Sequence, residues 1–293
     1  MRVVELFLSL TLSGVSLGMV YALQAIGLIL LLRAVGVMNF AQGDLLAIGA
    51  YALYFITVMH DIQGPIAIVL LLLFFVAFGA FFMMTTYWPV RKTKWEQALL
   101  VVTIGASTVI KELEMLICGS QPQTIEPIVR GSIQMGRFVL QYQYLFVFAI
   151  AGVLMVAVYV LFDKLYAGRA MSAAAQNKYA AELIGIPTKL TTLSTYAIVA
   201  TICGVCGALC APLFMVRTSL ATFQMKSFAG IVLGGFGNIK GAIVGSLIIG
   251  LIEAYSTYVT TIYKDVAVFG ALLLVLIFRP QGLFKGVTYQ EKA

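Results

Sequence analysis

Charged residues are scarce in this sequence. Only 11% of its 293 residues are Asp, Glu, Lys or Arg, whereas soluble domains carry roughly 25%. Hydrophobic residues make up 61%, well above the roughly 45–50% of soluble domains. A soluble fold of this length could not cover its surface with so few charges. The composition therefore excludes a soluble protein and predicts a polytopic integral membrane protein.

Histidine and cysteine are also rare. His60 is the single histidine, so this chain cannot build a multi-histidine metal site. Four cysteines in so apolar a chain do not make a disulfide scaffold. Cys203, Cys206 and Cys210 share one face of an apolar helix without a nearby histidine or acid, which favours packing over redox or metal chemistry. We therefore predict no catalytic residue and no bound metal.

Two further motifs are missing. The chain has no G-x-x-x-x-G-K-[ST] phosphate loop, so it does not bind and hydrolyse ATP in that way by itself. The net charge is +7, but there are no basic runs with interleaved aromatics of the kind that nucleic-acid-binding surfaces use. No connection between apolar stretches is long enough for a catalytic or ligand-binding domain. We expect a single transmembrane domain over residues 1–293 that binds no nucleic acid.

Long apolar stretches dominate what remains, and a spanning helix needs roughly 20 apolar residues. Seven stretches are candidates for ordinary spans: residues 6–32, 62–90, 97–117, 138–162, 190–216, 241–260 and 262–279. Residues 45–59 and 228–237 are shorter or rich in glycine, which indicates discontinuous helices beside a transport path, although loose packing or a bend has the same pattern. The sequence thus predicts an all-α fold with about eight transmembrane helices plus one or two short segments.

Basic residues concentrate in alternate connections. When residues 163–189 are placed in the cytoplasm, the basic clusters at 91–94 and 279–292 also lie there, as the positive-inside rule requires. This orientation puts the N-terminus outside and the C-terminus in the cytoplasm. If residues 228–237 only re-enter the membrane, the part of the chain after them is inverted.

Polar residues within apolar stretches are candidates for a translocation path. Gln24 lies near the middle of the first span and needs a polar partner or a wet cavity. Asp44 precedes an apolar helix and is expected to cap it, with Asn39 and Gln42 beside it as further candidates for wetting a path. Glu253 is the acid best placed to be intramembrane, or it faces the interface.

Glycines mark a second candidate region. Gly237, Gly241 and Gly245 stand four residues apart, a spacing that lets helix backbones approach closely in lipid. The same glycine-rich segment supplies the remaining candidates for the translocation path, which are Gly234, Gly235, Gly237 and Asn238.

The connection 163–189 carries a helix signal. Residues 169–184 are strong helix formers rich in Ala, and Gly185 is a good C-terminal stop. Such a helix is suited to a groove on a partner or, alternatively, packs under the membrane on its own protein. Glu182 lies unfavourably in the last turn with respect to the helix dipole, which suggests an external basic partner. The candidates for the partner contact are Arg169, Met171, Ala175, Tyr179, Glu182, Leu183 and Gly185.

Four motifs occur in order along the chain: GVMNFAQGDL at 36–45, GRAMSAAAQNKYAAELIGI at 168–186, VLGGFGNIKGA at 232–242 and FRPQGLF at 278–284. Together they resemble the permease subunits of ABC importers for branched-chain amino acids, with urea and short-amide permeases as relatives. Gln42 stands where many members of that family have His.

The resemblance implies an all-helical permease of the bacterial cytoplasmic membrane. It implies a dimer with a related second permease or with a second copy, two ABC ATPase subunits that use ATP below it, and an external substrate-binding protein. Residues 163–189 would be the coupling loop. The chain itself would bind no cofactor, contact membrane lipid and be no enzyme.

Other functions remain open. The nearest alternative is an ABC permease for urea or short amides. An ion-coupled secondary transporter would need buried charges along its path, and Glu253 is the one candidate in mid-sequence. An integral membrane enzyme would need a cluster of reactive side chains at one depth. The sequence does not name the substrate.

Overall fold

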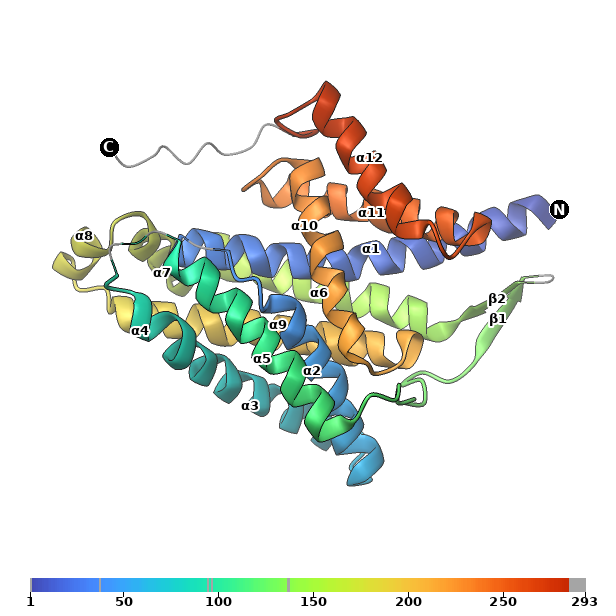
Figure 1. Ribbon diagram of the computed structural model, residues 1–293, viewed down its shortest axis with the longest axis horizontal. Helices are drawn as coiled ribbons and strands as arrows, with labels where there is room; N and C mark the ends of the chain where they lie inside the picture. Colours follow the sequence, from blue (N-terminus) through green and yellow to red (C-terminus); the bar gives the residue numbers. More distant parts are fainter. Residues whose placement is uncertain (1, 37, 94, 96, 136–137, 285–293) are drawn as a thin grey trace. The chain divides into compact units, whose positions relative to one another are not determined.

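The computed structural model describes residues 2–36, 38–93, 95, 97–135 and 138–284 (Figure 1). Helices dominate these residues, and the two named strands pair as one antiparallel hairpin. The elements are α1 (Arg2–Val35), α2 (Gln42–Tyr54), η1 (Phe55–Met59), α3 (Pro65–Phe82), η2 (Met83–Tyr87), α4 (Trp88–Val90), α5 (Ala98–Cys118), β1 (Ser132–Met135), β2 (Phe138–Gln141), α6 (Tyr142–Asp163), α7 (Tyr166–Gln176), α8 (Lys178–Leu183), α9 (Thr188–Phe214), η3 (Thr218–Thr222), α10 (Phe223–Gly234), α11 (Ile239–Val259) and α12 (Lys264–Phe278).

Six described helices are long and apolar enough to cross a membrane. They are Leu6–Arg33, Gln42–Met59, Pro65–Val90, Tyr142–Phe162, Thr188–Phe214 and Ile239–Val259. This confirms the predicted all-α, polytopic membrane protein. Two shorter or more polar helices also belong to predicted spans, since α5 carries Lys111, Glu112 and Glu114 and α12 has 15 residues. The total of about eight spans stays a prediction.

Two predicted segments differ from the structure. Residues 45–59 do not form an interrupted helix, because α2 runs without a break into the π-helical turn η1 and the two together make 18 residues. The predicted span 138–162 does not begin as a helix. Its first residues form β2, in which Val139 pairs with Gln134, and β-branched residues such as Val139 favour a strand.

Contacts group the chain into two compact units. The first unit comprises the described parts of Met1–Ile26, Pro127–Gly152 and Phe223–Ala293, and the second comprises those of Gly27–Glu126 and Val153–Thr222. Helices α1 and α6 each contribute to both units. Each unit has its own packing, described separately below.

In the second unit, α9 packs against α2 and α3 (Figure 1). Small residues of α9 make this possible. A Cβ added to Gly207 would overlap the carbonyl oxygen of Leu46, and one added to Gly204 would overlap the ring of Phe75 on α3. The backbones of α2 and α9 therefore approach as closely as the small-residue interfaces of membrane helices do.

In the first unit, α11 packs closely on α10 and on the first part of α1. Gly245 of α11 lies against the backbone of Gly230 and Gly234, and Gly241 lies against Gly234. Gly237 has another place, because it occupies the turn between α10 and α11 with a φ of +80°. The glycines at four-residue spacing thus divide into a turn residue and two packing residues.

We predict that Gly245→Ala destabilises the folded protein. The added methyl group would overlap the carbonyl oxygen of Gly230, and overpacking of this kind costs about 1–3 kcal/mol. The thermal unfolding midpoint of the purified protein in detergent measures the effect. Gly270→Ala is the matched control, because nothing lies within 4 Å of a Cβ at Gly270. Equal midpoints for the two variants would show that α10 and α11 are not held this closely.

Candidate functional site

The connection 163–189 contains two short helices, α7 and α8, rather than the single predicted helix over 169–184. The break falls at Asn177, whose backbone is extended (φ −149°, ψ 100°). Its side-chain oxygen accepts a hydrogen bond from the backbone N–H of Ala180 at 3.0 Å. Asn competes in this way with helix continuation and caps a new helix instead. The connection is therefore a helical hairpin with a fixed bend.

The end of α8 is tied to the start of α9. The backbone N–H of Ile186 donates to Ala181 O at 2.9 Å, and Gly185 between them has a φ of +83°. The hydroxyl of Thr188, the first residue of α9, donates to the carboxylate of Glu182. Glu182 thus has a partner within the chain, and this bond joins α8 to the first turn of α9.

The candidates for the partner contact do not all face outward. Tyr179 and Leu183 are 73% and 70% exposed, and Arg169, Glu182 and Gly185 are exposed as well. Met171, in contrast, is buried within the unit. The side chain of Ala175 lies outside the described residues. The apolar candidates are therefore divided, with Met171 on an inner face and Tyr179 and Leu183 on an outer face.

The polar candidates for a translocation path are all buried, and none of Gln24, Asn39, Gln42 and Asp44 is more than 2% exposed. Asp44 does not cap its helix as predicted, because α2 begins two residues earlier. The side chain of Asn39 accepts the N–H of Ala41 at 3.0 Å and shapes the approach to α2.

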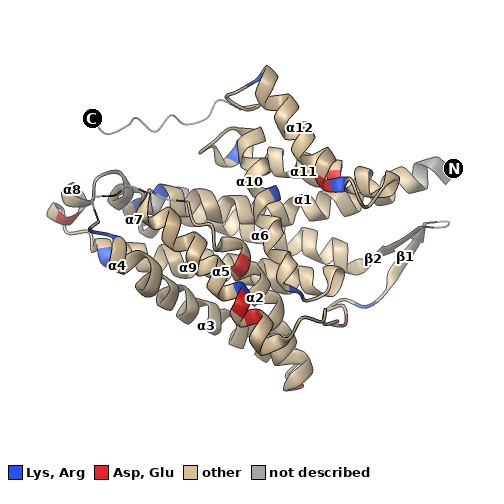
Figure 2. Cartoon of the chain, viewed as in Figure 1, with Lys and Arg blue, Asp and Glu red and all other residues tan. Residues whose placement is uncertain are grey.

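Asp44 instead faces α5. One of its carboxylate oxygens lies 3.8 Å from the ammonium nitrogen of Lys111. Figure 2 shows charged positions of both signs gathered where α2 and α5 meet in the second unit. This cluster is a binding candidate that neither residue indicates alone.

The glycine-rich candidates form a turn in the first unit. Gly235 and Gly237 have positive φ values, and the Asn238 side chain caps α11 by accepting the N–H of Gly241 at 3.2 Å. The C-terminal motif meets this turn, since the N–H groups of Leu283 and Phe284 donate to the carbonyls of Leu233 and Gly234, each at 2.9 Å. Two motifs that are distant in the sequence thus build one structural element. With 12 residues, α10 is about 18 Å long, which is short of the hydrocarbon thickness.

A buried ion pair in the first unit was missed by the sequence analysis. Lys226 lies within α10 at 4% exposure and pairs with the buried carboxylate of Glu253. The Tyr21 hydroxyl donates to the same carboxylate at 2.6 Å. Lys226 also lies 3.0 Å from Asp265, and Lys264 lies 3.7 Å from Glu253. A lysine within an otherwise apolar stretch near a lone intramembrane acid was the available signal.

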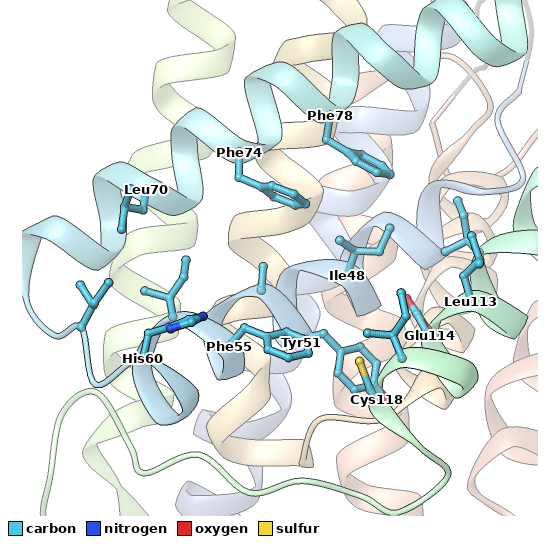
Figure 3. A pocket seen from close by; sticks show the side chains of 15 residues that line it. Ile48, Tyr51, Phe55, His60, Leu70, Phe74, Phe78, Leu113, Glu114 and Cys118 are labelled. Carbon is cyan, nitrogen blue, oxygen red and sulfur yellow. The ribbon is translucent and has the colours of Figure 1, made fainter.

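The second unit contains an apolar pocket of about 570 Å³ between α2, α3 and α5. Phe74 and Phe78 project into it from α3, and Tyr51 and Glu114 lie on its opposite side (Figure 3). Glu114 is 6% exposed, and neither carboxylate oxygen has a hydrogen-bond partner among the described residues. Glu114 lies near the end of the predicted span 97–117 and was not among the candidate site residues. Its three-residue spacing from Lys111 is the signal that could have placed both beside α2.

These features define an integral membrane protein of closely packed helices, and comparison with known proteins gives its family. A family model described as "Branched-chain amino acid transport system / permease component" matches residues 10–277. The chain therefore belongs to this permease family, as its four motifs indicated. It is a transporter subunit and an integral membrane protein.

Individual relatives agree. The high-affinity branched-chain amino acid transport system permease protein LivH of Escherichia coli K12 is 30% identical, with 94% of this chain and 95% of LivH covered. BraD of Pseudomonas aeruginosa is 29% identical with the same coverage. A probable LivH of Methanocaldococcus jannaschii is 27% identical, with 92% of this chain and 89% of that protein covered.

We predict that Glu253→Gln destabilises the permease strongly, because it leaves Lys226 buried without its main counter-charge. Removing one partner of a buried ion pair costs roughly 3–5 kcal/mol. Thermal unfolding in detergent measures the loss, and the double variant Lys226→Met with Glu253→Gln should recover most of it. Asp265→Asn is the control, since that side chain is 57% exposed and an exposed pair contributes about 0–1 kcal/mol. A double variant as unstable as the single one would argue against the pair.

Proposed function

We propose that this chain is the membrane-spanning subunit of an ATP-driven importer for branched-chain amino acids. The observation that carries the proposal is the family match over residues 10–277, supported by relatives whose names state this transport. The chemistry of the second unit agrees, because an apolar pocket with a few polar groups suits a small aliphatic substrate.

In this proposal, residues 1–293 act as one permease domain with residues 163–189 as its coupling loop. Two ABC ATPase subunits bind below and use ATP, so that the chain itself is no enzyme and needs no cofactor. A second permease, related or identical, completes the path, and an external binding protein delivers the substrate. The N-terminus lies outside and the C-terminus lies in the cytoplasm of the bacterial cell.

The coupling step follows from the hairpin α7–α8. Closure of the ATPase pair moves the exposed face of α8, where Tyr179 and Leu183 present apolar side chains. The bond from Thr188 to Glu182 transmits that movement to α9, which packs directly on α2 and α3. A two-state arrangement of these helices, biased by ATP at one end and substrate at the other, couples hydrolysis to transport.

We expect deletion of this chain's gene to abolish high-affinity uptake of labelled leucine, isoleucine and valine in its native cell. A plasmid copy should restore uptake, because the partner subunits remain present. The chain purified alone should neither hydrolyse ATP nor concentrate leucine in vesicles. Loss of urea or short-amide uptake with unchanged leucine uptake would assign the alternative substrate. Uptake by the chain alone, driven by a sodium or proton gradient, would refute the importer.

We also predict that replacing both Tyr179 and Leu183 by Ser weakens retention of the ATPase subunits roughly tenfold or more, because exposed apolar anchors carry much of an interface's binding energy. Folding should not change, since both side chains are exposed. Co-purification of the ATPase and leucine-stimulated hydrolysis measure the effect. Ile262→Ser, at a position that is 83% exposed outside this loop, is the control. Normal retention and transport in the double variant would make α8 a purely structural element.

A further inference from the structure

The pocket between α2, α3 and α5 has the size and lining of a small-molecule site. Its volume of about 570 Å³ falls within the roughly 300–1,000 Å³ typical of ligand pockets. Ile48 and Phe55 line it from α2 and η1, and Phe74 and Phe78 line it from α3 (Figure 3). Such walls accommodate a branched aliphatic group.

Glu114 is the polar feature that the walls do not satisfy. The side chain is 6% exposed and lines the pocket, and neither oxygen has a hydrogen-bond partner among the described residues. A carboxylate buried without a partner is costly. Here the polar group points to a ligand that would supply the missing donors.

The local charges indicate the sign of the charge that such a ligand carries. Asp44 on α2 and Glu114 on α5 are both buried, and Lys111, three residues before Glu114 on α5, lies 3.8 Å from Asp44. Lys111 therefore balances the charge of Asp44, and an ionised Glu114 would add a negative charge that no ion pair of the described residues offsets. The cluster complements one additional cation.

We propose that this pocket binds the branched aliphatic side chain and the ammonium group of an amino acid, with Glu114 as the counter-ion of the ammonium. The assignment rests on the proposed function, because it places the substrate of that importer in the second unit. An ammonium donates up to three hydrogen bonds, which satisfies both orphan oxygens of Glu114. The aliphatic side chain then lies against the rings of Phe74 and Phe78, which line the pocket.

The pocket carries its own reporter. Cys118 lines it and is partly exposed, whereas Cys203, Cys206 and Cys210 are fully buried. The rate at which a maleimide alkylates Cys118 therefore reports whether the pocket is occupied. The purified full-length permease in phosphatidylcholine nanodiscs, which offer no primary amine, is the sample.

Three probes separate the charges of the ligand: leucine, its decarboxylated analogue isoamylamine, and isocaproate, which lacks the amine. We expect leucine and isoamylamine to slow alkylation of Cys118 and isocaproate to leave the rate unchanged. Glu114→Gln should raise the half-protecting concentration of both amines roughly tenfold to a hundredfold, because a charge-assisted hydrogen bond is lost. Glu112→Gln, two residues away on α5 with an exposed side chain, should protect as the unmodified chain does.

Several results would overturn the assignment. They are equal protection by isocaproate, protection that survives Glu114→Gln, and no protection by leucine in a permease that imports leucine in cells. Phosphatidylethanolamine nanodiscs that slow alkylation without added ligand, and in which leucine adds nothing, would show a lipid headgroup in the pocket. The comparison of isoamylamine with isocaproate uses the unmodified chain. It therefore tests whether the pocket binds the ammonium group even if Glu114→Gln fails to fold.

The uptake assay separates this inference from the function on which it rests. If cells import leucine but leucine does not protect Cys118 from alkylation, the importer function is supported and the pocket is rejected as the amino acid site. If both amines protect Cys118 but deletion of the gene does not affect leucine uptake, the amine site is supported and the importer function is rejected.

Discussion

A charge buried among apolar helices is stable only beside a partner of opposite charge, and the two units of this chain meet that constraint differently. In the first unit the acid and base are matched, since Lys226 and Glu253 pair and Tyr21 completes the carboxylate's hydrogen bonding. In the second unit Lys111 pairs with Asp44, and Glu114 keeps two unsatisfied oxygens. The matched cluster stabilises its fold, whereas the unmatched one is open to a ligand.

Close helix packing gives both clusters their positions. Gly230, Gly234 and Gly245 bring the backbones of α10 and α11 together, which places Lys226 of α10 within reach of Glu253 on α11. Gly204 and Gly207 do the same for α9 against its neighbours in the second unit. Small residues at these crossings therefore determine which polar groups can meet.

The composition and the apolar runs were sufficient to predict the class of fold, because burial in lipid requires long uncharged helices. They could not locate the hairpin at β1 and β2, since its apolar residues merge with the following span. They also missed the bend at Asn177, which depends on one side-chain bond to Ala180. Asn is only a weak helix breaker by propensity. The sum of helix propensities over residues 169–184 therefore does not reveal that bond.

The candidate site was harder to predict from the sequence than the fold, because it depends on contacts between helices. Asp44 was singled out, but its neighbours on α5 are more than sixty residues away in the sequence, and pairing between helices leaves no local pattern. Lys226 falls outside every apolar stretch that the sequence predicts, because α10 is too short to register as a span. The four motifs, in contrast, identified the family because each is a contiguous run of residues.

The bonds from Leu283 and Phe284 to the end of α10 have a consequence for biosynthesis. The last carbonyls of a helix need donors from elsewhere, and here those donors arrive about fifty residues later in the chain. During translation, the end of α10 is therefore incomplete while α11 and α12 are still being made. The first unit closes only when its final segment emerges from the ribosome, so membrane insertion of its helices precedes their final packing.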